Sequence, residues 1–92
     1  MKNDLRELAN GYAMLSDKTR LAILELLARG PRNVTALCKA IGKRQPVVSH
    51  HLGLLRMNRM VIGTRKSKQV IYAMYKAALQ ALASGLKGLT RK

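Results

Sequence analysis

The sequence has no acidic residue after position 25. Its four carboxylate side chains are balanced by four Lys and Arg residues within the first 25 positions, and the other 14 basic side chains lie in residues 26–92. The net charge of +14 therefore belongs to this second part. Without a carboxylate, residues 26–92 cannot form a carboxylate dyad, a His–Asp pair or an oxygen-rich Mg²⁺ or Ca²⁺ site. A field of one sign instead favours a polyanionic partner such as nucleic acid.

Aromatic residues and cysteine are also scarce. The chain has no Phe or Trp and three Tyr, yet 48% of its residues are hydrophobic, so its core must be aliphatic. That is more apolar material than one small core needs, which indicates burial between subunits. A single cysteine, Cys38, cannot form an intrachain disulfide, and we interpret it as a small buried hydrophobe rather than a thiol sensor. No apolar run approaches 18 residues and no signal peptide is evident, so we expect a cytoplasmic protein without a membrane partner.

Hydrophobic periodicity predicts four helices, a β-hairpin and a last helix. Gly42 would end the third helix, Thr35 would cap it, and Asn58 would follow the fourth helix in a left-handed conformation. Gln45 and Pro46 would be the cap and first position of the fourth helix. The first helix is predicted over about 4–15, and the second runs from a cap at Ser16 or Asp17 to about residue 28. The third covers 36–41, and the fourth runs from Gln45 to about residue 57. The strands are predicted over 60–64 and 69–74, and the last helix over about 76–89.

The most informative segment joins two short helices through a turn. Residues 35–57 have the helix, glycine turn and second helix of a helix-turn-helix, and a basic hairpin over about 60–74 follows directly. A helix-turn-helix followed by a β-wing is a DNA-docking unit. We therefore predict one winged helix-turn-helix domain over residues 1–92, mainly α-helical with a small hairpin.

Three segments resemble the ArsR family of winged-helix repressors. Residues 15–24 (LSDKTRLAIL) resemble the family's second helix, residues 45–55 (QPVVSHHLGLL) its recognition helix, and residues 61–72 its wing. The resemblance extends over roughly residues 5–80 in one register. It implies a homodimer joined by the first and last helices, with the two recognition helices in successive major grooves of double-stranded DNA.

The predicted reading face lies opposite the apolar side of the fourth helix, where Pro46, Ser49, His50 and Gly53 fall, with Gln45 at the N-terminal end. By the resemblance, the residues that meet base edges are Gln45, Val47, Ser49 and His50. Gln pairs well with adenine, His with guanine N7 or a phosphate, and an apolar side chain with the thymine methyl group. His51 falls off this face, and we expect it to be packed or hydrogen-bonded.

A second set of residues is predicted to contact the DNA backbone. They share a positive charge and positions at the turn, the end of the fourth helix and the wing: Lys43, Arg44, Arg56, Arg59, Arg65, Lys66 and Lys68. Such contacts would position the protein without reading sequence. A basic residue often stands in relatives where this chain has Gly53, and glycine often stands where it has Arg59.

The predicted dimer interface consists of two leucine seams at the ends of the chain. Its residues are Leu5, Leu8, Tyr12, Leu79, Leu82 and Leu86. Such narrow stripes are suited to burying each other across a two-fold axis. The alternative is that both helices cover the protein's own core.

No cofactor, metal or enzymatic activity is predicted. The positions of the family's metal ligands near Asn33 and Thr35 hold no Cys, and residues 76–92 contain no Asp, Glu, His or Cys. We predict a repressor that binds an inverted-repeat operator and is associated with the nucleoid. Two alternatives remain open, a low-specificity architectural DNA-binding protein and a helix-mediated protein-interaction module.

Overall fold

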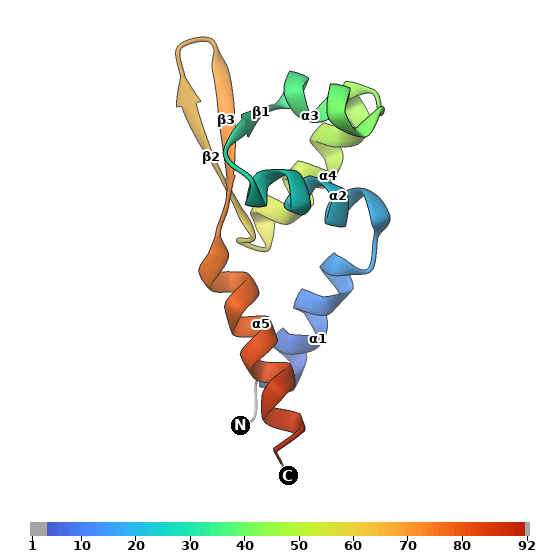
Figure 1. Ribbon diagram of the computed structural model, residues 1–92, viewed down its shortest axis with the longest axis vertical. Coiled ribbons are helices and arrows are strands. Elements are labelled where there is room, and N and C mark those ends of the chain that lie inside the picture. Colours follow the sequence, from blue (N-terminus) through green and yellow to red (C-terminus); the bar gives the residue numbers. More distant parts are fainter. Residues whose placement is uncertain (1–3, 92) are drawn as a thin grey trace.

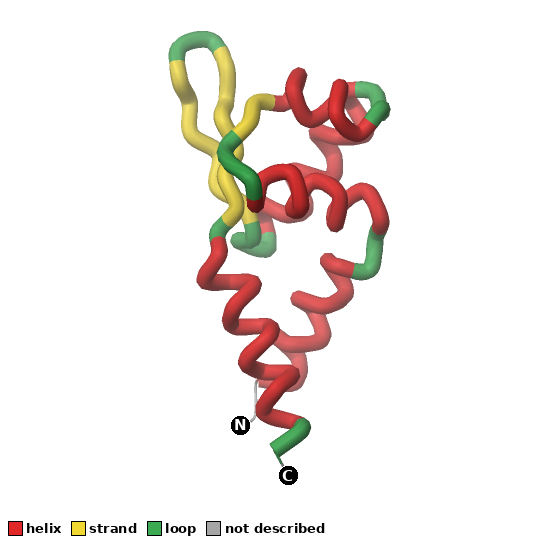
Figure 2. The backbone as a smooth tube through the Cα atoms, in the orientation of Figure 1, coloured by secondary structure: helices red, strands yellow, loops and turns green. Residues whose placement is uncertain are grey.

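The computed structural model describes residues 4–91 as five helices and a three-stranded antiparallel sheet. The molecule is elongated, 48 × 24 × 21 Å, and its two ends differ. Helices α1 and α5 lie at one end, whereas the hairpin tip and the α3–α4 pair lie at the other (Figures 1 and 2). The elements are α1 Asp4–Leu15, α2 Lys18–Ala28, β1 Arg32–Asn33, α3 Val34–Ile41, α4 Gln45–Met57, β2 Val61–Lys66, β3 Gln69–Met74 and α5 Lys76–Leu89.

The core is aliphatic, as the composition requires. Among the described residues, nine buried hydrophobic side chains form it, from α2, α3, α4, the residue before β2 and the first residue of β2: Ile23, Leu24, Leu27, Leu37, Val48, Leu52, Leu55, Met60 and Val61. Burying a side chain of this size contributes roughly 1.5–3 kcal/mol. The core therefore fixes α4 relative to α2 and α3. Each of the five helices is too short to cross a membrane, within the described residues.

Side-chain caps set the beginnings of α2 and α3. Asp17 Oδ1 accepts a hydrogen bond from Arg20 N at 3.0 Å, one of the two caps that the sequence indicated for α2. For α3 the predicted cap, Thr35, is wrong, because Asn33 Oδ1 accepts from Ala36 N at 2.8 Å and the helix begins at Val34. Asn33 is the better cap because it stands immediately before the helix in an extended conformation. Gly42 ends α3 at a φ of 78°, as predicted.

The two ends of α4 differ from the prediction by one residue each. Arg44 occupies the cap position without a side-chain hydrogen bond, and Gln45 is already helical, which makes Pro46 the second helical residue. At the other end, Asn58 has a φ of −94° and Arg59 takes the left-handed conformation with a φ of 59°. Asn58 instead uses its side chain, whose Nδ2 donates to Leu54 O at 2.9 Å.

The sheet contains a strand that the sequence did not predict. The two-residue strand β1 pairs antiparallel with β3, Arg32 opposite Tyr72 and Asn33 opposite Ile71. The hairpin itself runs from the Val61–Met74 pair to the Lys66–Gln69 pair, so its turn holds only Ser67 and Lys68. The predicted four-residue tip, 65–68, was therefore too long, because Arg65 and Lys66 remain in the ladder.

Glycines allow α1 and α5 to approach closely. A Cβ atom on Gly11 would lie 2.3 Å from Leu82 Cδ2, and one on Gly85 would lie 2.7 Å from Leu8 Cδ1. Tyr12 Oη donates to Leu82 O at 2.8 Å across the same contact. The two predicted leucine seams therefore meet within one subunit, at least in part.

Candidate nucleic-acid interface

Helix α4 buries one side and exposes the other. Val48, Leu52 and Leu55 are at most 1% exposed because they pack into the core. The four predicted base-reading residues, Gln45, Val47, Ser49 and His50, are all exposed. Val47 is 40% exposed although it is apolar. The structure thus leaves all four side chains accessible in the first half of α4.

His51 lies at the edge of this face and is partly buried. Its Nδ1 is 3.1 Å from Arg20 Nη1, and Arg20 Nε donates to Met14 O at 2.7 Å. Burial is the largest cause that lowers the pKa of His51. The nearby Arg20, His50 and Lys43 lower this pKa further, whereas the Asp17 carboxylate raises it. The sequence predicted that His51 is packed or hydrogen-bonded, but it did not predict the partner Arg20, 31 positions away.

The predicted backbone-contact residues are exposed at three places. Lys43 and Arg44 lie in the turn between α3 and α4, Arg65 and Lys66 end strand β2, and Lys68 lies in the hairpin turn. Figure 1 shows the α3–α4 pair and the hairpin tip at the same end of the molecule. Because residues 26–91 contain no carboxylate, nothing within this part neutralises their charge. This end therefore carries a positive field suited to a polyanion.

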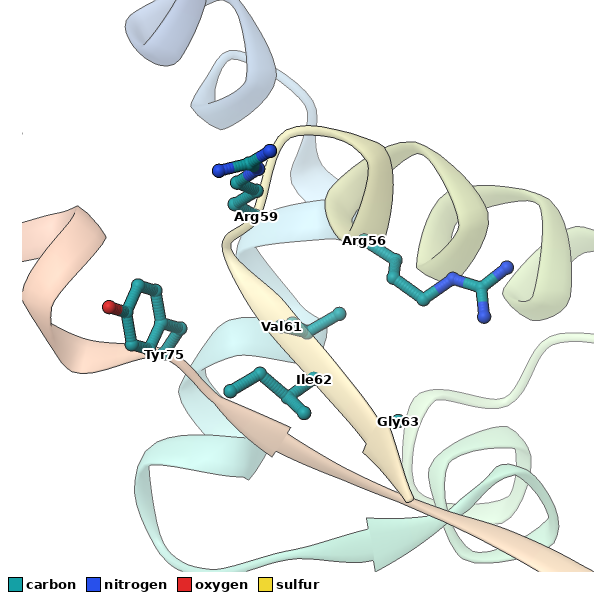
Figure 3. Close-up of a pocket in the computed structure, with 6 residues that line it drawn as sticks. All are labelled: Arg56, Arg59, Val61, Ile62, Gly63 and Tyr75. Atoms are coloured by element: carbon teal, nitrogen blue, oxygen red, sulfur yellow. The ribbon is translucent and has the colours of Figure 1, made fainter. Parts of the chain in front are cut away.

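Arg56 and Arg59 lie apart from that end. They line an open hollow with Val61, Ile62, Gly63 and Tyr75 between the end of α4 and the start of the hairpin. Figure 3 shows the two guanidinium groups pointing to different sides rather than converging. The hollow is therefore not a cradle for a single anion, and each arginine is available separately.

The predicted dimer residues divide into two groups. Leu8, Tyr12, Leu79 and Leu82 are half-buried by contacts within the chain, whereas Leu5 is 67% and Leu86 49% exposed. Leu89, at the end of α5, is 54% exposed as well. Leu5, Leu86 and Leu89 thus leave exposed apolar surface at the α1–α5 end of the molecule. Leu21 on α2, 49% exposed, is a further apolar surface residue that the sequence pattern did not separate from the core.

The part of the chain that the structure describes contains no cluster of potential metal ligands. Among residues 4–91, no three His, Cys, Asp or Glu side chains lie close enough together to hold an ion. Cys38 is partly buried on α3 and packs against the core.

A helix pair with an exposed outer face, followed by a basic antiparallel hairpin, defines a winged helix-turn-helix protein. The chain matches the model of the arsR family of bacterial regulatory proteins over residues 17–62. It is 34% identical over 86 residues to the biofilm growth-associated repressor of Xylella fastidiosa, covering 94% of this chain and 75% of that protein. The chain belongs to the arsR family, which confirms the resemblance seen in the sequence.

Other comparisons agree on the fold. The regulator NmtR of Mycobacterium tuberculosis is 39% identical over 69 residues, 75% of this chain and 58% of its own length. The chain thus spans little more than half of that relative. An ArsR-like regulator from Rhodococcus superposes with a TM-score of 0.86 at 26% identity, covering 95% of this chain and 82% of the other. These likenesses confirm the predicted winged helix-turn-helix fold.

Proposed function

We propose that the protein is a transcriptional repressor that binds double-stranded DNA as a homodimer. The observation that carries the proposal is the outer face of α4, whose Gln45, Val47, Ser49 and His50 are exposed while its inner face is locked in the core. The family and the repressor named among its relatives support regulation. The protein would act in the cytoplasm, associated with the nucleoid.

The basic residues would hold the DNA backbone. Lys43, Arg44 and the wing residues stand at the same end of the molecule as α4, where they can neutralise phosphates on either side of the groove. Arg56 and Arg59 would reach phosphates further along. The reading residues would then supply the discrimination between bases.

Dimerisation would use the exposed apolar remainder of α1 and α5. Leu5, Leu86 and Leu89 are the apolar side chains that this end leaves in solvent. Leu8, Tyr12, Leu79 and Leu82 would support the interface from behind, because they already pack within the subunit. Two-fold symmetry implies an inverted-repeat operator with half-sites about one helical turn, roughly 34–36 Å, apart.

We propose that the protein works without a metal or other cofactor. Cys38 is its one thiol, and among the described residues the histidines are adjacent on a single helix, where side chains diverge by about 100°. Neither arrangement supplies the four ligands that a zinc-like ion needs. No catalytic role is proposed either.

Selection of bound sites from random DNA tests the central claim. We expect wild-type protein to recover one inverted repeat. His50→Ala should reduce the preference for that repeat over scrambled DNA by about 1–3 kcal/mol. Lys66→Ala is the control and should weaken both duplexes about equally, because it touches only the backbone. Unchanged discrimination in His50→Ala would show that the reading face is misplaced.

A low-specificity architectural protein is the second candidate, favoured by the charge of +14. Footprinting on genomic fragments separates the two functions. A repressor protects discrete palindromes, whereas an architectural protein covers the fragments uniformly. A third outcome would indicate a protein-interaction module. In that case the protein would form a stable complex with another protein and would bind DNA no more strongly than its charge explains.

A further inference from the structure

One arginine side chain connects three helices. Arg20 lies in the first turn of α2, where its backbone N–H donates to Asp17 Oδ1 at 3.0 Å. Its Nε donates to the carbonyl of Met14 in the last turn of α1, at 2.7 Å. Its Nη1 lies 3.1 Å from Nδ1 of His51 on α4. The guanidinium group of Arg20 thus joins the end of α1 to α4.

The contact with His51 fixes the protonation of the imidazole. Arginine has only donors and keeps its charge in proteins, so Nδ1 of His51 must be the acceptor. The neutral ring then carries its proton on Nε2. A proton on Nδ1 would remove the acceptor and place a second cation against Arg20.

We propose that Arg20 is a positioning residue for DNA recognition, which holds α4 to the end of α1 through His51 for as long as Nδ1 of that residue is unprotonated. The inference rests on the proposed function, since it assumes that α4 reads DNA. His51 follows directly on Ser49 and His50 and stands between the buried Val48 and Leu52. A change in its anchoring is therefore passed to the adjacent reading side chains.

Four charged or titratable groups face His51. Asp17 and Arg20 come from the start of α2, Lys43 from the α3–α4 turn, and His50 from the same helix. Burial and the three basic groups lower the pKa of His51 below its ordinary 6.5, against the pull of Asp17. The contact is therefore complete above about pH 6.5 and is lost as the pH falls through the lowered pKa.

Two substitutions of His51 distinguish the role of its hydrogen-bond acceptor from the role of its protonation. Asn places an amide oxygen near the position of Nδ1 and does not titrate, whereas Leu has a similar size and no acceptor. Both leave the four reading residues unchanged. At about pH 7.5 we expect His51→Asn to bind the selected duplex like wild type and His51→Leu to bind about tenfold more weakly. Scrambled DNA should change less.

Acidification provides the second comparison. As the pH falls from above 6.5 through the lowered pKa of His51, wild type should lose affinity for the selected duplex relative to His51→Asn. Parallel profiles for the two proteins, or equal binding by His51→Leu and wild type, would overturn the inference.

Substitutions of Arg20 test the other partner. Arg20→Lys keeps the charge, but one ammonium group cannot span the two acceptors as Nε and Nη1 do. We expect Arg20→Lys and Arg20→Gln each to lower affinity for the selected duplex, and the double variant Arg20→Gln/His51→Leu to be no weaker than the more affected single variant. Additive losses would contradict a shared role.

A measurement without DNA completes the test. NMR titration of the ring should show a higher pKa for His51 in Arg20→Gln than in wild type, because a neighbouring cation is gone. An unchanged pKa would contradict the contact, and circular dichroism checks that the variant is folded. Failure of wild type to select any discrete duplex would contradict the proposed function itself. A discrete duplex that the Arg20 and His51 variants bind as wild type does would contradict this inference alone.

Discussion

Single polar side chains cap the beginnings of two helices, α2 and α3. Asp17 shows the effect through its acid–base properties as well as its geometry. The hydrogen bond from Arg20 N lowers the pKa of the Asp17 carboxyl below its ordinary 3.8, an effect that the charge of His51 reinforces and partial desolvation opposes. The cap is therefore at full strength above about pH 3.8 and is lost as the pH falls through the lowered pKa.

Asp17→Asn should remove this dependence on acid. Asn caps helices about as well as Asp, so the variant should unfold at nearly the wild-type urea concentration at about pH 6. Below about pH 4, wild type should lose more stability than the variant does, because its carboxylate becomes protonated. Urea unfolding followed by circular dichroism across this range measures the difference.

Glu25→Gln is the matched control for that experiment. The Glu25 side chain is 73% exposed and its ion pair with Arg29 is long, at 3.9 Å, so it contributes little to stability. We expect its acid profile to follow that of wild type. The chain has only four Asp and Glu residues, so few other groups contribute in this range. Equal acid losses in Asp17→Asn and wild type would refute the role of the cap.

At the scale of elements, the strongly periodic helices and the hairpin were predictable and their ends were less so. Val48, Leu52 and Leu55 marked the inner side of α4 by spacing alone. Asn33 and Thr35 are both good capping residues, and only tertiary structure decided for Asn33. That decision came from β1, a strand too short to show any alternation of its own.

The exposed faces were predictable for the same reason, but the contacts between distant segments were not. Exposure of His50 follows from its spacing to the buried residues of α4, whereas Gln45, seven positions before Leu52, is exposed as the first residue of the helix. The link from Arg20 to His51 spans 31 positions and depends on how α2 crosses α4, which periodicity does not encode. The meeting of α1 and α5 within one subunit was likewise open in the sequence, where each helix had one leucine stripe.

The helical glycines Gly11 and Gly53 differ in the space around them. Gly11 is buried against Leu82, whereas a Cβ on Gly53 in α4 would meet nothing within 4 Å. We expect Gly11→Ala to destabilise the protein by about 1–3 kcal/mol through overpacking. Gly53→Ala, the control, should stabilise it by up to about 1 kcal/mol because alanine favours the helix. Chemical unfolding at one protein concentration compares them, and a Gly11→Ala protein as stable as Gly53→Ala would refute close packing of α1 on α5.

At the scale of the whole molecule, charge and apolar surface are separated along the long axis. The α3–α4 turn and the wing place basic side chains at one end, and Leu5, Leu86 and Leu89 leave apolar surface at the other (Figure 1). Such a division suits a protein that pairs through one end and meets a polyanion with the other. Lys76, Lys87 and Arg91 do not follow the division, and only the long-range field accounts for them.

Salt should therefore weaken binding steeply, and by an amount that depends on position. If about six to ten phosphates are neutralised, affinity should fall about 10³- to 10⁵-fold between 50 and 200 mM salt. Lys66→Ala at the wing should reduce the slope of log affinity against log salt by about one. Lys87→Ala on α5 removes the same charge from the opposite end and should leave the slope unchanged. Fluorescence anisotropy on the selected duplex measures both, and equal slopes for the two variants would contradict the proposed orientation.

The pairing of β1 with β3 joins the start of the helix-turn-helix to the wing, so we expect recombination to exchange the two together. Asn33 caps α3, pairs with Ile71 in the sheet, and donates from Nδ2 to Gln69 Oε1 at 2.7 Å. A recombination breakpoint between residues 34 and 60 would separate a helix start from the strand against which it is built. Chimaeras that exchange DNA preference between relatives should therefore carry residues 32–74 together, and homologous wings should vary in step with the residues that precede α3.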